Sequence, residues 1–398
     1  MNGLAVLGGV LAAAPVLLLA IYALEVTAGL PRQRRTPVDD GPAPETVVLV
    51  PAHDEAAGIA ATVQALVAQA GPMTRVLVVA DNCADETAAR ARAAGADVLE
   101  RRDPARRGKG YALAFGREAL IAAPPACVVI VDADCTIAPG GLGRLAGEAV
   151  GRGRAVQSCN LLRPDPTAAP TAQISNFAFL VKNLVRQRGM ARLGGVAALT
   201  GTGMAIPWPL FRDAPLASAE LAEDLALGVW LVRQGVPPAY LETVNTWSDS
   251  ASGRTLLTQR GRWERGFLRT ARLQALPLVG TGIARLSPSR LWLGLHLLVP
   301  PLALLFALAG GMLVVLAVLA LLGAGITPAL LLVAALAAAG GATVLAWFRE
   351  GRAQVSGRAL LRAPAYVLMK LPVYRTMLGR GEASWVRTRR AGEDERGA

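Results

Sequence analysis

The stretch Cys127-Val128-Val129-Ile130-Val131-Asp132-Ala133-Asp134 decides the fold that this sequence predicts. Its first five residues are apolar and mostly β-branched, which predicts a buried strand, and two carboxylates follow that strand directly. Similar apolar runs stand upstream at 46–50 and 75–79, and alanine-rich stretches of helical character separate the three. Near-continuous apolar strands that alternate with helices predict an α/β domain built on a parallel sheet with helices on both faces.

Acidic residues follow all three of these strands. Asp54 and Glu55 come after the first, Asp81 after the second, and Asp132 and Asp134 after the third. Because ligands bind outside the carboxyl ends of parallel strands, we expect these side chains to meet at one rim of the sheet. Their mutual repulsion predicts that a cation or a hydroxyl-rich ligand occupies this rim.

Asp132 and Asp134 form a D-x-D motif. Residues two apart in an extended chain point to the same side, so both carboxylates can reach one ligand. This spacing suits Mg²⁺ or Mn²⁺ that also holds phosphate oxygens, whereas the alternative is a pair of aspartates that cap a turn. Its place at the end of an apolar strand makes the metal site as good an interpretation as the cap.

Two glycine-containing stretches exclude other nucleotide chemistries. Gly108-Lys109-Gly110 lacks the first glycine and the final Ser or Thr that a phosphate-binding P-loop needs. Gly201-Thr202-Gly203 begins like a dinucleotide fingerprint, but Ile206 stands where the third glycine belongs. The sequence therefore supports neither an ATPase nor a dehydrogenase.

Composition and charge indicate a membrane protein rather than a nucleic-acid binder. Hydrophobic residues make up 53% of the 398 residues and charged residues only 18%, while the net charge is +12. The basic excess lies in 32–35, 254–290 and 349–398, beside apolar segments, as expected at a membrane surface. Four cysteines without zinc-site spacing exclude a disulfide scaffold and indicate a reducing compartment: Cys83, Cys127, Cys135 and Cys159.

Two uncharged apolar blocks predict three membrane spans. Residues 3–24 are long enough for one retained helix, and 291–348 hold two helices with a turn at 323–328. Arginines after the first and last spans place residues 31–290 in the cytoplasm by the positive-inside rule. Residues 355–380 mix apolar and basic side chains, which is typical either of a helix in the membrane interface or of one packed on the soluble domain.

The motifs occur in the order found in the membrane-bound family 2 glycosyltransferases, which the chain resembles over about residues 44–270. This family includes synthases of cellulose and hyaluronan, and ceramide glucosyltransferases. Besides the D-x-D, the matching elements are an early aspartate, an E-D pair and a Q-x-x-R-W motif, at Asp81, Glu223-Asp224 and Gln259-Arg260-Gly261-Arg262-Trp263. The resemblance implies a GT-A-like, Rossmann-type domain with a mixed sheet, one N-terminal transmembrane helix, and a C-terminal transmembrane hairpin followed by an interfacial helix.

On this pattern the chain divides into five segments. They are an anchor, a cytoplasmic catalytic domain, a region with Q-x-x-R-W and interfacial helices, a transmembrane hairpin, and a basic interfacial helix with the C-terminal tail. A fourth span would place the basic tail on the wrong side of the membrane, so the last segment is not expected to cross it. The expected segments are 1–30, 44–250, 251–290, 291–348 and 349–398.

The resemblance assigns a role to each motif. Asp224, with Glu223 beside it, is the general base, although two acids in the first turn of a helix can also simply complement its dipole. Asp134, with Asp132, holds Mg²⁺ or Mn²⁺. Two alternatives stay open: Lys109 as plain surface charge, and the Q-x-x-R-W segment as an Arg-rich interfacial helix. Residues expected to face the donor are Glu55, Asp81, Lys109, Asp132, Gln259, Arg262 and Trp263, and those near the acceptor are Gly201, Thr202 and Trp263.

The implied function is an inverting, metal-dependent transfer of a sugar from a nucleotide diphosphate, most often UDP, to a membrane lipid or a lipid-linked saccharide. The catalytic domain is expected on the cytoplasmic side of a bacterial inner membrane. Few spans argue against a channel for a long polymer, but Q-x-x-R-W is often associated with processivity, so a processive polysaccharide synthase stays an alternative. A catalytically silent membrane scaffold is the alternative of another class, and the complete set of motifs argues against it.

Overall fold

The computed structural model describes residues 3–32, 43–218, 220, 222–249 and 253–378, and these fold into two compact units. The D-x-D and E-D motifs belong to the sheet unit, and Q-x-x-R-W belongs to the helical unit. Among the described residues, the sheet unit contains 43–163 and 194–249, and the helical unit contains 3–32, 164–193 and 253–378.

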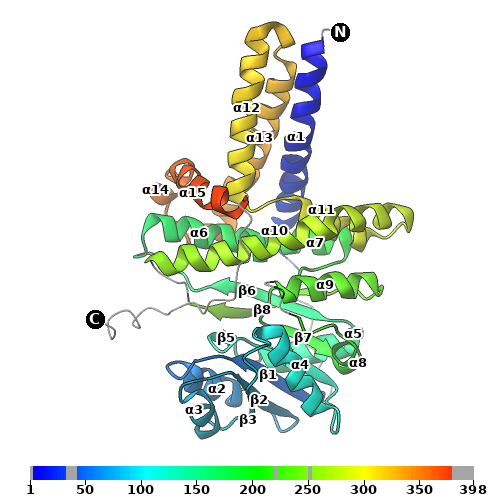
Figure 1. Ribbon diagram of the computed structural model, residues 1–398, viewed down its shortest axis with the longest axis vertical. Coiled ribbons are helices and arrows are strands. Elements are labelled where there is room, and N and C mark those ends of the chain that lie inside the picture. Colours follow the sequence, from blue (N-terminus) through cyan, green and yellow to red (C-terminus); the bar gives the residue numbers. More distant parts are fainter. Residues whose placement is uncertain (1–2, 33–42, 219, 221, 250–252, 379–398) are drawn as a thin grey trace. The chain divides into compact units, whose positions relative to one another are not determined.

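The sheet unit is built on one sheet with the strand order β3-β2-β1-β4-β7-β6-β8-β5 (Figure 1). Strand β2 is parallel to β1 and β3, and β1 is parallel to β4, as the apolar runs predict. Strand β7 is antiparallel to β4 and β6, β6 is parallel to β8, and β5 is antiparallel to β8. The mixed sheet that the resemblance implies is therefore confirmed. The strands are β1 Thr46–Ala52, β2 Thr74–Asp81, β3 Asp97–Arg101, β4 Cys127–Ile130, β5 Cys135–Ile137, β6 Val156–Leu162, β7 Met204–Pro207 and β8 Ala239–Ser248.

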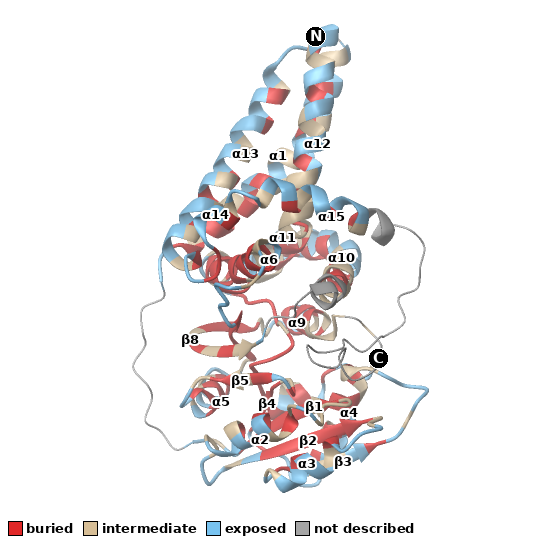
Figure 2. Cartoon of the chain, turned by 90° about the vertical axis from the view of Figure 1, so that its left-hand side faces the viewer, coloured by how far each residue is buried: buried red, intermediate tan, exposed pale blue. Residues whose placement is uncertain are grey.

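Apolar side chains cover both faces of the central strands. In β1, Val48 and Val50 belong to one core and Val47 and Leu49 to the other, because successive side chains of a strand point to opposite faces. Helices α2, α3 and α5 contribute to the first core, and α4, α8 and α9 to the second, so the central strands are buried (Figure 2). These helices are α2 Ile59–Val67, α3 Thr87–Ala93, α4 Lys109–Leu120, α5 Gly141–Arg152, α8 Trp208–Arg212 and α9 Glu223–Arg233.

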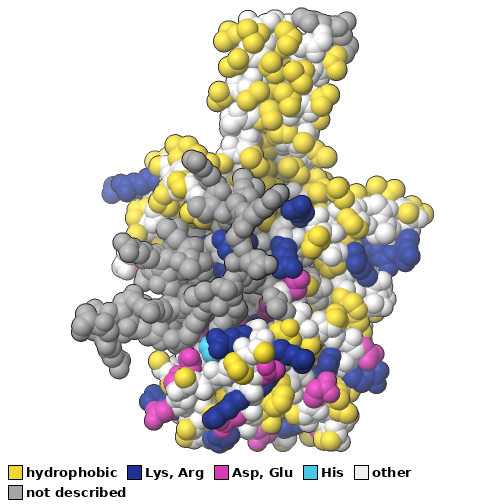
Figure 3. All heavy atoms as spheres, in the orientation of Figure 1, with side chains coloured by type: hydrophobic (Ala, Val, Ile, Leu, Met, Phe, Trp, Pro, Cys, Tyr) yellow, Lys and Arg dark blue, Asp and Glu magenta, His cyan; other side chains and the backbone are white. Residues whose placement is uncertain are grey.

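Three helical segments of the helical unit are long and apolar enough to cross a membrane, as the sequence predicts. They are Gly3–Gly29, Leu302–Ala324 and Thr327–Gly351. The three segments pack against one another, and the face of this bundle seen in Figure 3 is covered by hydrophobic side chains. Gly323 and Gly325 have φ angles of 94° and 83° between the last two segments, so the predicted turn is confirmed.

The remaining helices of the helical unit surround one end of this bundle, where α6, α10 and α11 lie across it (Figure 1). Helix α11 ends at Leu298 and α12 begins at Leu302, so Pro300 and Pro301 separate the apolar residues before them from the hairpin helices. The helices of this unit are α1 Gly3–Gly29, α6 Pro170–Leu180, η1 Val181–Arg186, α7 Gln187–Gly194, α10 Gly253–Ala284, α11 Pro288–Leu298, α12 Leu302–Leu319, η2 Ala320–Ala324, α13 Thr327–Ala346, η3 Trp347–Gly351, α14 Gly357–Leu360 and α15 Ala363–Leu378.

Buried ionic contacts join the helices at this end of the bundle. Arg186 Nε donates to Glu25 Oε2 at 2.6 Å, and His296 Nδ1 lies 3.0 Å from Glu25 Oε1. Arg188 Nη1 donates to Glu350 Oε1 at 2.9 Å. Because a buried charge is costly unless it is paired, these contacts fix α1, η1, α7, α11 and η3 to one another. The sequence analysis assigned no role to these residues.

Candidate active site

The carboxyl ends of β1, β2 and β4 lie at the same edge of the sheet, as the parallel arrangement predicts. Ala52 at the end of β1 pairs with Ala80 of β2, and Leu49 of β1 pairs with Ile130 at the end of β4. The acidic residues that follow these strands therefore begin at one rim. At this rim Asp132 is half-buried and Asp134 is exposed.

Lys109 is the centre of the polar contacts at the rim. It is the first residue of α4, and its Nζ donates to Asp132 Oδ1 and to the Gly201 carbonyl oxygen (2.7 Å). The same nitrogen lies 3.8 Å from Glu223 Oε1. Burial works against the ammonium form, but the carboxylates of Asp132 and Glu223 outweigh it and raise the pKa of Lys109 above its usual range. Lys109 is thus a cation that connects the D-x-D, the loop at Gly201 and the start of α9.

The E-D pair opens α9, as expected. Glu223 and Asp224 occupy the first turn of this helix, and Asp224 Oδ1 accepts a hydrogen bond from the Leu225 amide at 2.8 Å. Burial raises the pKa of Glu223 to about 7, against the opposing effect of Lys109 and with a further contribution from Asp224. Glu223 therefore exchanges its proton near neutral pH.

The loop at Gly201 brings backbone into close contact with the acidic residues. Gly201 has a φ angle of 86°, and a Cβ atom there would lie 3.3 Å from both Asp224 Oδ2 and Lys109 Nζ. The neighbouring Thr202 accepts a hydrogen bond on its Oγ1 from the Asp132 amide at 3.1 Å. The structure therefore brings together six of the predicted site residues, which come from four separate stretches of sequence.

Gln157 supports this loop, and the sequence analysis missed it. Its side chain is fully buried in β6, donates to the Thr202 carbonyl oxygen at 2.9 Å and accepts from the Thr200 amide at 2.9 Å. A buried amide needs hydrogen-bond partners, and the partners of Gln157 lie in a loop more than forty residues away, so its own stretch of sequence gives no signal of this role.

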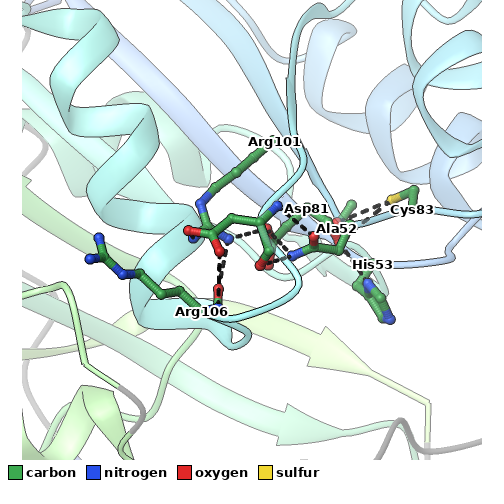
Figure 4. A network of polar contacts seen from close by, with 8 residues as sticks. Ala52, His53, Asp81, Cys83, Arg101 and Arg106 are labelled. Atoms are coloured by element: carbon green, nitrogen blue, oxygen red, sulfur yellow. Dashed lines mark hydrogen bonds and ion pairs between the residues drawn. The ribbon is translucent and has the colours of Figure 1, made fainter.

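Asp81 is held in a polar network at the ends of β2 and β3 (Figure 4). Arg101 Nη1 donates to Asp81 Oδ1 at 2.6 Å, and Asn82 Nδ2 donates to the same oxygen at 2.9 Å. Arg101 also donates to Asp103 Oδ2 at 3.0 Å. Burial raises the pKa of Asp81, and Arg101 opposes that shift. The sequence analysis missed Arg101, which is the direct register partner of Asp81 in the β2–β3 pair.

The loop after β1 carries Glu55, another of the predicted donor residues. His53 Nδ1 lies 2.6 Å from the Asp81 carbonyl oxygen, so this histidine connects the loop to the end of β2. Glu55 is half-buried, and its backbone amide donates to Thr87 Oγ1 at 2.7 Å. The loop is therefore fastened to both β2 and the start of α3.

The D-x-D offers a donor set that fits a hard divalent cation. Oxygens of Asp132 and Asp134 and the sulfur of Cys135 lie within 4.8 Å of one another. Burial raises the pKa of the Cys135 thiol well above its ordinary value, so the thiol stays protonated and is a poor ligand. The two carboxylates are the oxygen ligands that Mg²⁺ and Mn²⁺ prefer.

The Q-x-x-R-W motif lies on α10 in the helical unit, where Gln259, Arg262 and Trp263 are half-buried. The Trp263 ring lies 5.7 Å from the Phe179 ring of α6. The guanidinium of Arg260 lies 4.8 Å from the centroid of each ring. Burial lowers the pKa of Arg260 to about 10, so it stays a cation between two aromatic faces. The motif leaves this position unspecified, and the sequence analysis gave Arg260 no role.

Comparisons with known proteins agree with this geometry. Residues 42–266, more than half of the chain, match the model of a family described as glycosyltransferase like family 2. The mannosyltransferase PcManGT from Pyrobaculum calidifontis, solved with GDP-Man and Mn²⁺, is 18% identical with a TM-score of 0.57, over 95% of this chain and 100% of that chain. Glucosyl-3-phosphoglycerate synthase from Mycobacterium tuberculosis, solved with UDP, is 20% identical with a TM-score of 0.43, over 60% and 84%. No curated protein matches the sequence.

Proposed function

Because the chain belongs to glycosyltransferase family 2, we propose that it transfers a hexosyl group from a nucleotide diphosphate sugar, with UDP as the carrier, to a membrane lipid or a lipid-linked saccharide. The observation that carries the proposal is the convergence of Lys109, Asp132, Glu223 and Asp224 beside the backbone of Gly201. Asp132 follows the carboxyl end of the parallel strand β4, where ligands of such sheets bind, and the other groups converge on it within the part of the chain that the family model matches.

Asp224 is the proposed general base. The acceptor oxygen forms its bond to the anomeric carbon while the bond from that carbon to the diphosphate oxygen breaks, and Asp224 takes the acceptor proton. Direct attack inverts the anomeric configuration. Glu223 supports this role, because a group that is partly protonated near neutral pH reduces the repulsion on its neighbour and leaves Asp224 as the carboxylate. Gly201 leaves room for a sugar hydroxyl beside Asp224.

Asp134, with Asp132, is the proposed site of Mg²⁺ or Mn²⁺, which supplies charge stabilisation to the departing diphosphate when it is bound. Lys109 provides a second, fixed cation next to Asp132. The carboxylate of Asp81, oriented by Arg101, accepts hydrogen bonds from base or ribose. The other proposed donor contacts are Glu55 to the nucleoside, and Gln259, Arg262 and Trp263 to the diphosphate or the sugar.

The acceptor class is inferred from the helical unit. The Q-x-x-R-W helix α10 belongs to the same unit as the three segments that are apolar enough to cross a membrane. A lipid acceptor held in the bilayer would therefore meet a unit that also carries part of the proposed donor site. The basic residues beside the spans support a catalytic domain on the cytoplasmic side of a bacterial inner membrane.

One observation favours a second candidate, a processive polysaccharide synthase. The complete Q-x-x-R-W motif on α10 is of the type associated with repeated addition. Against it, the part of the chain that the structure describes holds three candidate spans, which is few for a channel around a polymer. The length of the product separates the two candidates.

The test is a transfer assay with the full-length protein in lipid nanodiscs. A panel of UDP- and GDP-sugars is supplied with Mn²⁺ or with chelator, and the products are identified by mass spectrometry. We expect metal-dependent addition of one or a few sugars to a lipid. Asp224→Asn should lower kcat about a thousandfold while donor binding persists. Asp213→Asn is the matched control, because that carboxylate lies exposed on the same unit and forms its ion pair with the exposed Arg212.

Each negative result has a distinct meaning. Turnover of no donor in the presence of Mn²⁺ would support the silent scaffold and reject the proposed function. Near-normal turnover by Asp224→Asn would reject the base assignment alone. A ladder of long saccharide products would replace single addition by the processive alternative.

A further inference from the structure

Arg260 is a buried cation in the middle of the Q-x-x-R-W motif. It is 7% exposed, and it lies in the same compact unit as α6 and α15. Its Nη2 donates to Asn176 Oδ1 at 3.3 Å, while its Nε has no hydrogen-bond partner among the described residues. A buried charge is costly unless it is paired, so we expect this arginine to lower the stability of the helical unit relative to an apolar residue. That cost indicates a role other than stability.

The acidic residue on the same face of α10 is paired with another cation. Glu264 lies one turn after Arg260, and its Oε1 accepts a hydrogen bond from the Nζ of Lys370 on α15. Lys370 is 2% exposed, so this carboxylate and this ammonium neutralise each other inside the protein. In the part of the chain that the structure describes, no carboxylate lies within ion-pair distance of the Arg260 guanidinium. Aromatic rings are therefore the groups that compensate its charge.

The guanidinium contacts two rings that also contact each other. It lies 4.8 Å from the ring centroid of Phe179 and 4.8 Å from that of Trp263, and the two centroids are 5.7 Å apart with 37° between the ring planes. Arg260 and Trp263 share a face of α10 because they are three residues apart, whereas Phe179 comes from α6. The indole of Trp263 is thus held from its own helix and from a neighbouring one.

We propose that Arg260 is a positioning residue, which holds the indole of Trp263 in the orientation used to stack on a sugar. This inference rests on the proposed function, in which Trp263 contacts the donor or the acceptor. A cation is attracted to the face of an aromatic ring, so the guanidinium fixes the plane of the indole as well as its place. Its planar shape lets it lie against two rings while its edge donates to Asn176, which the compact ammonium of a lysine cannot reproduce.

The first measurement reports the orientation of Trp263 and needs no turnover. The seven tryptophans of the full-length protein are replaced by 5-fluorotryptophan, and Trp263→Phe identifies the ¹⁹F resonance of position 263 in detergent micelles. We expect one narrow resonance in the wild type, because the ring is held in one orientation. Arg260→Met removes the cation and keeps an unbranched side chain, so it should broaden or split this resonance and leave the others unchanged. Arg260→Lys keeps the charge and should keep a single resonance.

The second measurement separates positioning from structural support. Because Arg260→Met removes a buried cation that has no carboxylate partner, the midpoint of thermal unfolding should stay unchanged or rise. The kcat of sugar transfer should fall about a hundredfold, since a small displacement of a positioned group can cost that much, while the affinity for UDP in saturating Mn²⁺ stays the same. Arg260→Lys should recover part of that loss. Arg272→Met is the control, because it removes the same charge from an exposed position on α10 and should change none of these values.

A single narrow resonance of Trp263 in Arg260→Met would show that the ring keeps its orientation without the cation, and would overturn the proposal. Lower thermal stability together with changes in every tryptophan resonance would assign Arg260 to structural support and also overturn it. Arg260→Gln is a second uncharged variant, so that a folding defect caused by the methionine alone leaves the test decisive. If the wild type transfers no sugar, the proposed function fails, while the resonance of Trp263 still decides whether Arg260 orients that ring.

Discussion

The substitution Lys109→Met removes the cation at the centre of the rim while keeping a side chain of similar length. In the wild-type protein the ammonium bonds to Asp132 and lies 3.8 Å from Glu223. A divalent cation at the D-x-D has to share Asp132 with that ammonium and is repelled by it. We therefore expect the variant to bind Mn²⁺ more tightly than the wild type when no donor is present.

The size of this effect follows from the separation and exposure of the charges. Two unit charges about 4 Å apart interact by about 4 kcal/mol at an effective dielectric constant of about 20. The Lys109 and Asp132 side chains are 20% and 35% exposed, so water screens part of this interaction. Screening reduces the interaction energy to about 1–2 kcal/mol, which corresponds to a gain in Mn²⁺ affinity of about tenfold when the lysine is removed. Binding of a nucleotide diphosphate should change in the opposite sense, because its phosphates lose a neighbouring cation.

Isothermal titration calorimetry with Mn²⁺ alone, and then with UDP in saturating Mn²⁺, measures both effects. Arg102→Met is the control, because it removes the same formal charge from the same unit at a side chain that is 83% exposed. The control should leave both affinities unchanged within error. An unchanged or weaker Mn²⁺ affinity in Lys109→Met would refute the reasoning that the lysine and the metal compete for Asp132.

Three further perturbations test other parts of the structure. Arg101→Lys replaces a planar guanidinium group by an ammonium group, so the carboxylate of Asp81 loses its orientation. The KM for the donor should rise about tenfold, while kcat should change little. An equal fall in kcat would show that Arg101 stabilises the transition state. Lys370→Met leaves the Glu264 carboxylate without its buried partner and should lower the free energy of unfolding by about 3–5 kcal/mol. The double variant with Glu264→Gln should recover most of that loss in thermal unfolding, and equal loss in both variants would show that the pair does not act as a unit. Burial raises the pKa of Glu223 from 4.5 to about 7, so in chelator the folded protein keeps a proton that the unfolded chain releases in that window. The free energy of unfolding should therefore fall by up to about 3 kcal/mol as the pH rises from 4.5 to 7, and Glu223→Gln should flatten that slope in denaturation measured across pH.

The central strands and the position of the acidic rim could be predicted because their signals are local. An apolar run such as that of β4 needs only its own residues to indicate a buried strand. Parallel pairing then fixes which end of each strand faces the ligand. The positions of Asp81 and Asp132 in the sequence are therefore enough to predict that both lie at the same rim. The order of β7, β6, β8 and β5 has no such signal, because pairing between strands that are distant in the sequence depends on connections that periodicity does not encode.

The supporting residues of the site were not predictable for a related reason. Arg101 pairs with Asp81, which lies twenty positions earlier in the chain, and Gln157 bonds to a loop more than forty residues further on. Each looks ordinary in its own stretch of sequence, since an arginine at a strand end or a glutamine in a strand is common. Only the sheet register brings Arg101 opposite Asp81. The motifs therefore predicted the residues of the proposed reaction, whereas the residues that orient them could be identified only from the structure.

The two units differ in which kinds of side chain face outward. An apolar run in the sequence therefore indicates a buried segment in the sheet unit but can indicate an outward-facing one in the helical unit. In the sheet unit, water is the outer medium, so the cores are apolar and ion pairs such as Arg75 with Asp97 lie at the surface. In the helical unit, Leu308 and Leu368 point outward, while Glu25 and Lys370 are buried with their partners. Such an arrangement costs free energy in water, because exposed leucine gains nothing and a buried ion pair loses hydration. Outward leucines cost less where the outer medium is hydrocarbon, which agrees with the three segments of this unit that are apolar enough to cross a membrane, and a charge that adjoins such segments needs a partner inside the protein.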